Sequence, residues 1–458
     1  MKHQRSLPLP RGGEGWGEGR ASPDVVREER SIGDAWDRSP LSPNPSPPSG
    51  ARGAVSLCLA LLVGCAATAR ADNWPQWRGP NRTGVTSDAG VPIKWSATDN
   101  VRWKVRLPGQ GISNPIVWGD RVFVTASDGP EQSELHIVCL DRDSGRERWH
   151  RRQWGTAPTL FHATKSGMAA PSPVTDGERL YTFFGTGDVF CFDMEGGLVW
   201  HRSLAAEYGA FENRFAASSS PLVHDGALIL QCDHYGASYV LAIDVRTGAN
   251  RWKADRPECW LSWSSPQVVS AGDAAELIVC GSEKLDAYDP RTGSKLWTLR
   301  GLARECIPTP LVGHGLLFAV SGPNGTSFAI RPGGRGDVTE SHVVWKTERG
   351  TPFVPSGILV GDRYYLVDDK GIATCLDAHS GKQLWRRRFG GAFTASPVSA
   401  DGRIFFTNES GTTLVVDAAS DDREVARNEI GEPVYASPAI SQGRLFLRTD
   451  KHLVCIGQ

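Results

Sequence analysis

Hydrophobic residues from about position 100 onward fall into short runs separated by polar turns, and one arrangement of run and turn recurs. "LDRDSGRERW" ends at Trp149, "IDVRTGANRW" at Trp252, "YDPRTGSKLW" at Trp297 and "LDAHSGKQLW" at Trp385, and a reduced form, "FDMEGGLVW", ends at Trp200. Each reads as the end of one strand, a tight turn and the start of another, since short apolar runs bounded by Gly, Asp and Ser are typical of strands. We find no 3.6-residue periodicity long enough to predict a helix.

A second phrase precedes each of these turns and sets the period of the repeat. It consists of a Ser-Pro-like dipeptide, an apolar pair, a "DG" or "GD" turn and a further strand, as in "SPVSADGRIFF". We call the first residue of the phrase the marker. The markers are Asn114, Ser172, Ser220, Ser265, Thr309, Ser356, Ser396 and Ser437, with steps of 58, 48, 45, 44, 47, 40 and 41 residues. Eight units of about four strands predict an all-β fold, an eight-bladed β-propeller of four-stranded antiparallel blades.

Each unit is expected to run from an inner strand A through strands B and C to an outer strand D. In the unit that ends at Trp385, Asp377 can accept backbone N–H groups across the turn, and Gly381 supplies the positive φ that the turn needs. The tryptophan of strand D should cover the gap between blades, which diverge outward. The predicted structural docking residues are Trp103, Trp149, Trp200, Trp252, Trp297, Trp345 and Trp385.

Closure of the ring follows from the two ends of the repeat. The last unit, from Ser437 to Gln458, has room for three strands only, whereas "NVRWKVRL" (100–107) lies before the first marker. We therefore predict that this N-terminal strand completes the last blade and leaves no open sheet edge. Unit seven has Val425 where the tryptophan is expected, and unit five has a lengthened turn, "RPGGRGDVTESHVVW".

The N-terminal region divides into three parts. Residues 1–53 are low-complexity Gly/Glu and Pro/Ser tracts that cannot form a core, residues 54–71 read as a signal peptide, and residues 72–458 form the propeller. The apolar run is too short for a transmembrane span. An A-x-A-like site would release a chain starting at Asp72, whereas a lipobox-like "LVGC" would leave Cys65 lipidated. The sequence predicts export to the periplasm or beyond, and leaves open whether the product is lipid-anchored or soluble.

Charge and cysteine content narrow the possible partners and ligands. With 50 basic and 51 acidic residues, no bulk charge recruits nucleic acid or an anionic membrane. Four cysteines occupy one position of the repeat, where other units carry alanine, so we predict buried thiols and no disulfide framework. No Cys or His spacing matches a zinc motif. The position holds Cys139, Cys191, Cys375 and Cys455, or Ala242, Ala287 and Ala329.

The "D-x-x-T/S-G-x-x-x-W" phrase resembles the tryptophan-docking motif of the quinoprotein (pyrroloquinoline quinone-like, PQQ-like) β-propellers, from about residue 100 to the end. Size and plan are similar to the BamB family of outer-membrane assembly lipoproteins. The opening "DNWPQWRGPNRTG" resembles secreted planctomycete-type PQQ-like repeat proteins. For catalytic members the resemblance implies PQQ and Ca²⁺ above the axis and oxidation of alcohols or sugars. This chain has no Cys-Cys dipeptide and no stretch that matches a calcium-site motif, so we name no catalytic residue. A PQQ/Ca-dependent dehydrogenase remains the alternative.

A binding site is expected where the segments from each outer strand to the next inner strand ring one mouth of the channel. These segments combine charge with aromatic surface, as a site for a protein partner or small ligand would. The candidate residues are Glu212, Arg214, Glu258, Cys259, Trp260, Trp263, Glu305 and Cys306. Cys259 and Cys306 could be reactive thiols, a disulfide or buried residues. "CDHYG" (232–236) receives no metal assignment, because neighbouring side chains on a strand face opposite ways. We predict an exported, non-catalytic binding scaffold without a cofactor.

Overall fold

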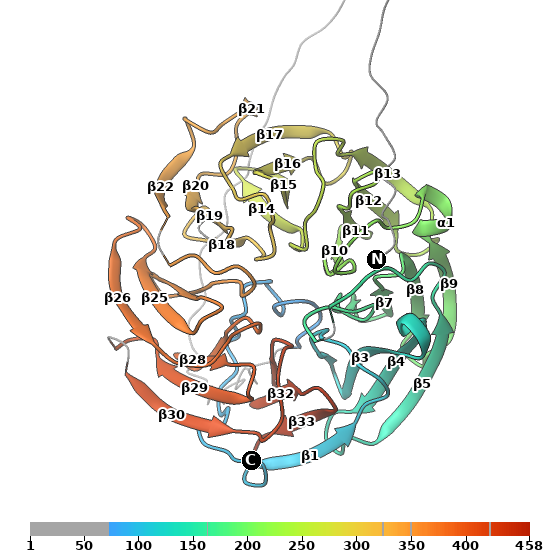
Figure 1. Cartoon of the computed structure of the whole chain (residues 1–458), viewed down its shortest axis with the longest axis vertical. Helices are drawn as coiled ribbons and strands as arrows, with labels where there is room; N and C mark the ends of the chain where they lie inside the picture. The colour runs from blue at the N-terminus through green and yellow to red at the C-terminus, as the bar shows by residue number, and fades with distance from the viewer. Residues whose placement is uncertain (1–72, 163, 323–324, 349, 421–422) are drawn as a thin grey trace, which may run out of the picture. The chain divides into compact units, whose positions relative to one another are not determined.

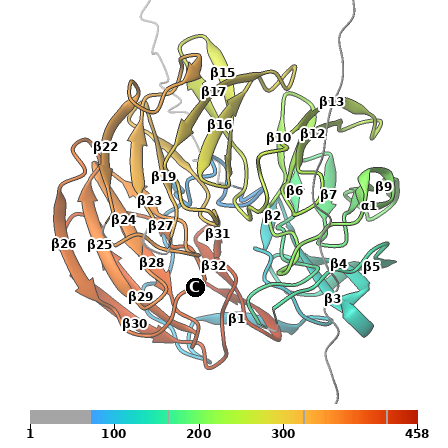
Figure 2. The ribbon, with the colours of Figure 1, turned by 45° about the horizontal axis from the view of Figure 1, so that its top comes forward.

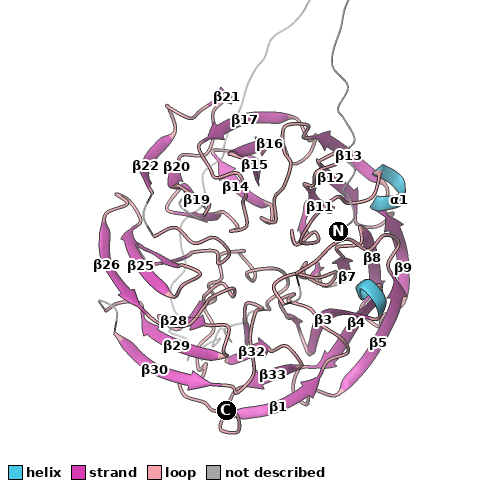
Figure 3. Cartoon of the chain, in the orientation of Figure 1, coloured by secondary structure: helices cyan, strands magenta, loops and turns pink. Residues whose placement is uncertain are grey.

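The computed structural model describes residues 73–458, apart from 163, 323–324, 349 and 421–422. This part of the chain forms a closed ring of eight sheets, which confirms the predicted eight-bladed propeller (Figure 1). Its only helical segments are α1 (Leu204–Tyr208) and a 3₁₀ turn (Pro130–Gln132), so nearly all regular structure is strand (Figure 3). None of the helices described is long and apolar enough to cross a membrane. The low-complexity tracts, the predicted signal peptide and the candidate lipidation residue Cys65 lie outside the described residues.

The first four blades follow the chain in order, each from inner strand A to outer strand D. Blade one is β2 (Ile116–Trp118), β3 (Arg121–Asp128), β4 (Glu134–Asp141) and β5 (Glu147–Trp154). Blade two is β6 (Val174–Thr175), β7 (Arg179–Phe183), β8 (Asp188–Asp193) and β9 (Leu198–Ser203). Blade three is β10 (Leu222–His224), β11 (Ala227–Cys232), β12 (Tyr239–Asp244) and β13 (Asn250–Asp255). Blade four is β14 (Gln267–Ala271), β15 (Ala274–Gly281), β16 (Lys284–Tyr288) and β17 (Lys295–Arg300).

The remaining blades repeat this order. Blade five is β18 (Leu311–Gly313), β19 (Leu316–Val320), β20 (Ser327–Ile330) and β22 (Val343–Thr347). Blade six is β23 (Ile358–Val360), β24 (Arg363–Val367), β25 (Ile372–Asp377) and β26 (Gln383–Arg388). Blade seven is β27 (Val398–Ala400), β28 (Arg403–Thr407), β29 (Thr412–Asp417) and β30 (Glu424–Glu429). Blade eight is β31 (Ala439–Ser441), β32 (Arg444–Arg448), β33 (His452–Ile456) and β1 (Val101–Arg106).

Closure by the N-terminal strand is confirmed. Strand β1 pairs antiparallel with β33, and Trp103 lies opposite Cys455 in the register. The ring is thus sealed by hydrogen bonds between strands that are about 350 residues apart in sequence, and β1 covers the outer edge of β33 in blade eight.

The docking tryptophans explain why one position of strand C stays small. Each tryptophan lies directly opposite the Cys or Ala position on the neighbouring strand, as Trp149 does with Cys139 and Trp252 with Ala242. The indole also reaches the next blade. Trp252 Nε1 donates to Pro290 O at 2.9 Å, and a Cβ on Gly293 would lie 2.5 Å from the ring. A small residue beneath the indole and a glycine beside it are therefore both steric requirements.

Two blades depart from this rule and show how the fold compensates. Trp297 meets the lengthened turn of blade five, where Glu276 accepts from its Nε1 at 2.9 Å and from Gly333 N at 3.0 Å. Part of that turn adds a parallel strand, β21 (Gly336–Asp337), to the outer edge of blade four, which the sequence did not predict. In blade seven, Val415 holds the position that is Cys or Ala in the other blades, and the residue opposite it is Ala426. The expected assignment of the tryptophan position to Val425 is therefore wrong by one residue.

In blade seven, Trp95 from the N-terminal segment fills the place of the missing docking tryptophan. Its ring stacks on Phe405 with centroids 6.2 Å apart, and Ala426 packs against the same hydrophobic cluster. The corresponding strand-B aromatic residues of other blades contact their own docking tryptophans, as Phe446 contacts Trp103 at 6.0 Å. An indole from outside the repeat therefore fills the space that Ala426 leaves.

The markers form a ring of hydrogen bonds around the axis. In six of the eight steps, the backbone N–H of one marker donates to the hydroxyl of the next blade's marker at 2.8–3.0 Å, beginning with Asn114 N to Ser172 Oγ. A short hydroxyl side chain at the start of each strand A satisfies a buried N–H group there. The repeated serine is thus a requirement of the inner ring.

The segment 73–90, which we call the plug, crosses the face formed by the A–B hairpins and runs through the middle of the ring in two views (Figures 1 and 2). It hydrogen-bonds all eight blades. The acceptors and donors on blades one to eight are in turn Val117, Thr175, Val223, Gln267, Thr309, Gly357, Ser399 and Gln442. Trp74 and Arg78 of the plug are fully buried. The plug thus ties the blades together and closes one end of the channel.

Candidate functional site

The open end of the channel holds a cavity of about 220 Å³ on the propeller axis. The segments that lead from each strand D into the next strand A line it, and seven of the eight contribute side chains. The lining is Ile112, His162, Lys165, Ser166, Phe215, Ser218, Trp263, Glu305, Ile307, Phe353, Val354 and Thr394. Half of these side chains are apolar, and they supply most of the exposed lining surface, which is typical of a site that receives an apolar group and orients it.

A single position of the repeat supplies half of the residues that line this cavity. The residue two places before each marker faces the axis in every blade. In blade order these residues are Ile112, Ala170, Ser218, Trp263, Ile307, Val354, Thr394 and Tyr435. The sequence contained this signal in the register of the markers, but the preceding residues differ in type and so did not stand out. Most of the cavity was therefore missed by sequence reasoning.

Ion pairs between loops surround the cavity. Lys165 Nζ lies 2.7 Å from Glu409 Oε1, which joins a loop of blade two to blade seven across the mouth. Arg214 pairs with Glu305, and its guanidinium lies 4.9 Å from the centre of the Phe215 ring. Phe353 N donates to Asp369 at 2.7 Å, and burial raises the pKa of that carboxyl. The rim is thus charged while the wall below it is apolar.

The predicted mouth residues other than the two cysteines fall into three groups. Trp263 and Glu305 line the axial cavity, and Trp263 Nε1 donates to Ala216 O at 2.9 Å. Glu212 and Arg214 line an adjoining shallow groove of about 610 Å³.

Trp260 and Glu258 belong to neither hollow. Trp260 is 48% exposed beneath the Arg304 guanidinium, and Glu258 turns outward to Lys284 at 2.7 Å. The structure therefore brings together Trp263, Glu305 and Arg214, and it places Trp260 and Glu258 away from the axis.

Cys259 and Cys306 are free thiols in the interior. Burial raises the pKa of Cys259 to about 11 and raises that of Cys306 well above its usual range. Cys306 Sγ donates to Gly281 O at 3.0 Å. Of the alternatives left open by the sequence, burial agrees with the structure, whereas a disulfide and an accessible reactive thiol do not. Neither residue can touch a partner of the folded chain.

The "CDHYG" stretch serves a buried ion-pair network behind the mouth. Arg256 lies 2.9 Å from Asp233 and 3.1 Å from Asp286, and all three side chains are buried. Burial opposes ionisation of Asp286, but Arg256 and the hydrogen bonds from Lys295 and Thr298 hold its pKa below the usual range. His234 stacks on Phe211. Asp233 is therefore committed to a salt bridge with Arg256 inside blade three, and the second ion pair of Arg256, with Asp286, joins blade three to blade four.

The other end of the channel is closed by the plug. Trp77 enters a narrow space of about 80 Å³ ringed by the markers, where its Nε1 donates to Thr309 Oγ1 at 2.9 Å. The cavity thus opens at one mouth, and its floor is set by the marker ring and this indole. No pattern in the sequence predicted that the segment containing Trp77 would occupy the axis.

Comparisons with known proteins agree with this architecture. The family described as outer membrane protein assembly factor BamB matches residues 79–298, 219–385 and 369–456. The outer membrane protein assembly factor BamB of Yersinia pestis is 23% identical over 328 residues, which cover 68% of this chain and 77% of that protein.

Solved structures show the same fold. BamB from Moraxella catarrhalis has a TM-score of 0.56 at 14% identity, covering 78% of this chain and 96% of that chain. The quinohemoprotein alcohol dehydrogenase from Comamonas testosteroni has a TM-score of 0.62 at 12% identity, covering 84% of this chain and 81% of that chain. Likeness to structures at these identities establishes the fold only.

Proposed function

Because the chain belongs to the family of the outer membrane protein assembly factor BamB, we propose that it is an exported, non-catalytic scaffold that binds a polypeptide at the axial mouth. The ligand class is an extended segment with a large apolar or aromatic side chain, as the strands of outer-membrane proteins carry. Such a side chain would enter the cavity, and its backbone and polar neighbours would contact the charged rim.

The observation that carries this proposal is the apolar wall beneath a charged rim. Ile307, Phe353 and Val354 come from two loops and present carbon surface to the axis, while Lys165 and Glu305 stand around it. A volume of about 220 Å³ is below the roughly 300–1,000 Å³ of common small-molecule sites and suits one or two side chains. Rigid loops on a closed ring also hold such a pocket ready, which lowers the entropic cost of binding.

The residues of the cavity do not fit PQQ with Ca²⁺, the cofactors of the dehydrogenase alternative. Ca²⁺ requires six to eight oxygen ligands, typically several carboxylates. Glu305 is the one carboxylate among the described residues that line the cavity, and it is paired with Arg214. The quinone carries three carboxylates, which need cationic side chains as partners. Lys165, a cation of the lining, is already paired with Glu409. The donor set therefore supports binding of an apolar group over binding of this cofactor.

The test uses fluorescently labelled synthetic peptides that span strands of an outer-membrane β-barrel protein, with anisotropy as the readout. A peptide with an aromatic residue should bind the full chain, and its copy with serine at that position should bind about 30-fold more weakly, as expected for loss of a central anchor. Val354→Glu should abolish binding, because it places a charge in the apolar wall. Val354 is partly exposed at the axis, so this change should leave the ring folded.

Trp260→Ala is the matched control, since Trp260 is a mouth-loop tryptophan that lies off the axis. It should leave peptide affinity unchanged. Peptide binding that Val354→Glu does not weaken would contradict the site. Quinone-dependent oxidation of an alcohol or sugar in the presence of PQQ and Ca²⁺ would instead favour the dehydrogenase.

A further inference from the structure

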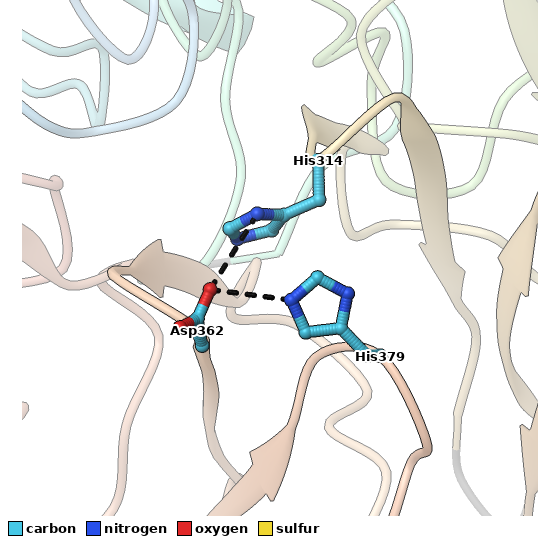
Figure 4. Close-up of side chains that lie close together, drawn as sticks. All are labelled: His314, Asp362 and His379. Carbon is cyan, nitrogen blue, oxygen red and sulfur yellow. Dashed lines mark hydrogen bonds and ion pairs between the residues drawn. The ribbon is translucent and has the colours of Figure 1, made fainter.

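His314, Asp362 and His379 converge on the face opposite the mouth, at the junction of blades five and six (Figure 4). His314 lies in the A–B turn of blade five, Asp362 in the A–B turn of blade six and His379 in the C–D turn of blade six. Asp362 Oδ1 is 3.7 Å from His314 Nδ1 and 3.2 Å from His379 Nε2. Within the described parts of the chain, this is the one group of three such side chains whose donor atoms all lie within 4.8 Å of one another.

The surrounding backbone orients these donors. His314 Nε2 lies 2.9 Å from Gly361 O, and since a carbonyl only accepts, Nε2 carries the proton. The lone pair of Nδ1 then faces Asp362, an arrangement that ligating histidines commonly have. Ala378 N donates to Asp362 O at 2.9 Å, which holds the two turns of blade six together. Turns of the propeller thus hold the three residues close together.

The repeat itself shows that the fold does not require histidine here. At the junction of blades eight and one, the corresponding positions are Gln442, Asp120 and Asp143. The position of His379 is Arg246 in blade three and Arg291 in blade four. Glutamine, aspartate and arginine therefore satisfy the same turns elsewhere, and the two imidazoles facing one carboxylate need another explanation.

We propose that His314, Asp362 and His379 bind a divalent transition-metal ion, with Zn²⁺ as the ion that this donor set fits best. Two imidazole nitrogens and one carboxylate oxygen are preferred by Zn²⁺ and its neighbours, whereas Ca²⁺ and Mg²⁺ prefer oxygen ligands alone. Bonds of about 2.0–2.1 Å in a tetrahedron place ligand atoms roughly 3.3 Å apart, close to the two distances to Asp362. The ion would clamp blade five to blade six and keep one coordination position for water.

The experiment is calorimetric titration of ZnCl₂ into the full chain without an affinity tag. We expect one Zn²⁺ per chain, with no comparable heat from CaCl₂ or MgCl₂. His379→Arg and His314→Gln each introduce the residue that another blade carries, so both should fold. Because each removes a ligand, affinity should fall by more than about 100-fold. His224→Gln, a change of a lone histidine at the A–B turn of blade three, is the matched control and should bind as the wild type does.

Two further measurements separate a built site from loose surface binding. Co²⁺ should give the intense visible absorption of four-coordinate cobalt in the wild type and not in His379→Arg. Zn²⁺ should also raise the melting temperature of the wild type and not that of the two ligand variants, since binding to the folded state stabilises it. Zn²⁺ affinity that the two ligand variants leave unchanged, or that His224→Gln lowers equally, would overturn the proposal.

Discussion

Replacement of Gly293 by alanine tests the docking contact directly. Gly293 has φ +72°, and a Cβ there would lie 2.5 Å from Cε3 and 2.7 Å from Cδ2 of Trp252. The left-handed backbone alone costs a non-glycine residue about 1–2 kcal/mol. Overpacking against a buried ring adds about 1–3 kcal/mol. We expect Gly293→Ala to lower the free energy of unfolding by about 2–5 kcal/mol.

Gly272 supplies the control in the same blade. It has φ +63°, and an added Cβ would meet no atom within 4 Å. Gly272→Ala should therefore cost the backbone contribution only, about 1–2 kcal/mol. The difference between the two variants isolates the contact between the turn and the indole, because both carry the same chemical change at a positive φ.

A double-mutant cycle then identifies the partner. Trp252→Ala should itself cost about 3–5 kcal/mol, as emptying a buried aromatic site does. In that background the ring is gone, so Gly293→Ala should cost no more than Gly272→Ala, which gives a coupling of about 1–3 kcal/mol. Urea unfolding followed by circular dichroism measures all four proteins. Equal costs for Gly293→Ala with and without Trp252 would refute the steric account of the repeated glycine.

Two further predictions concern the N-terminal region. Deletion of residues 73–90 removes contacts to all eight blades and the fully buried Trp74, so it should cost several kcal/mol and lower the melting temperature; an unchanged melt would contradict the assigned role of the plug. Lys104 of β1, Thr449 and His452 contact the Glu432 carboxylate. Burial alone would raise the pKa of this carboxyl, but these partners lower it to about 2. Since the folded-state pKa is depressed, this stability is present above pH 4.5 and is lost as the pH falls toward 2. Glu432→Gln should therefore weaken the protein at neutral pH and flatten the acid limb of a pH–stability curve, and identical acid limbs would disprove the linkage.

The repeat made the fold predictable because its requirements are local. Turn glycines, the aspartates that accept N–H groups across turns, and tryptophans opposite small residues all lie within one unit. Asp377 does accept from Ser380 N at 2.8 Å, and Gly381 has φ +69°. Exceptions such as Trp95 acting for blade seven were not predictable, because that contact joins residues more than 300 positions apart.

The candidate sites were less predictable for a related reason. The mouth loops were located correctly by topology, but which side chains point to the axis depends on the register of each loop with its marker. Trp260 and Trp263 are three residues apart and end in different environments. The His314–Asp362–His379 group comes from three separate turns, so no spacing along the chain could reveal it.

Seen from the order of synthesis, the contacts of the plug and of β1 set a limit on when the molecule can fold. Trp103 pairs with Cys455, and Asp88 with Gln442. The first described residues therefore cannot make these contacts until the last residues of the chain have been synthesised. At roughly 5–20 residues per second, that interval is on the order of half a minute. Until then the ring cannot close, and the apolar residues of the N-terminal segment have no place to bury. Contacts this distant in sequence also favour slow folding, so this segment is where a chaperone would act and where an interrupted chain would aggregate.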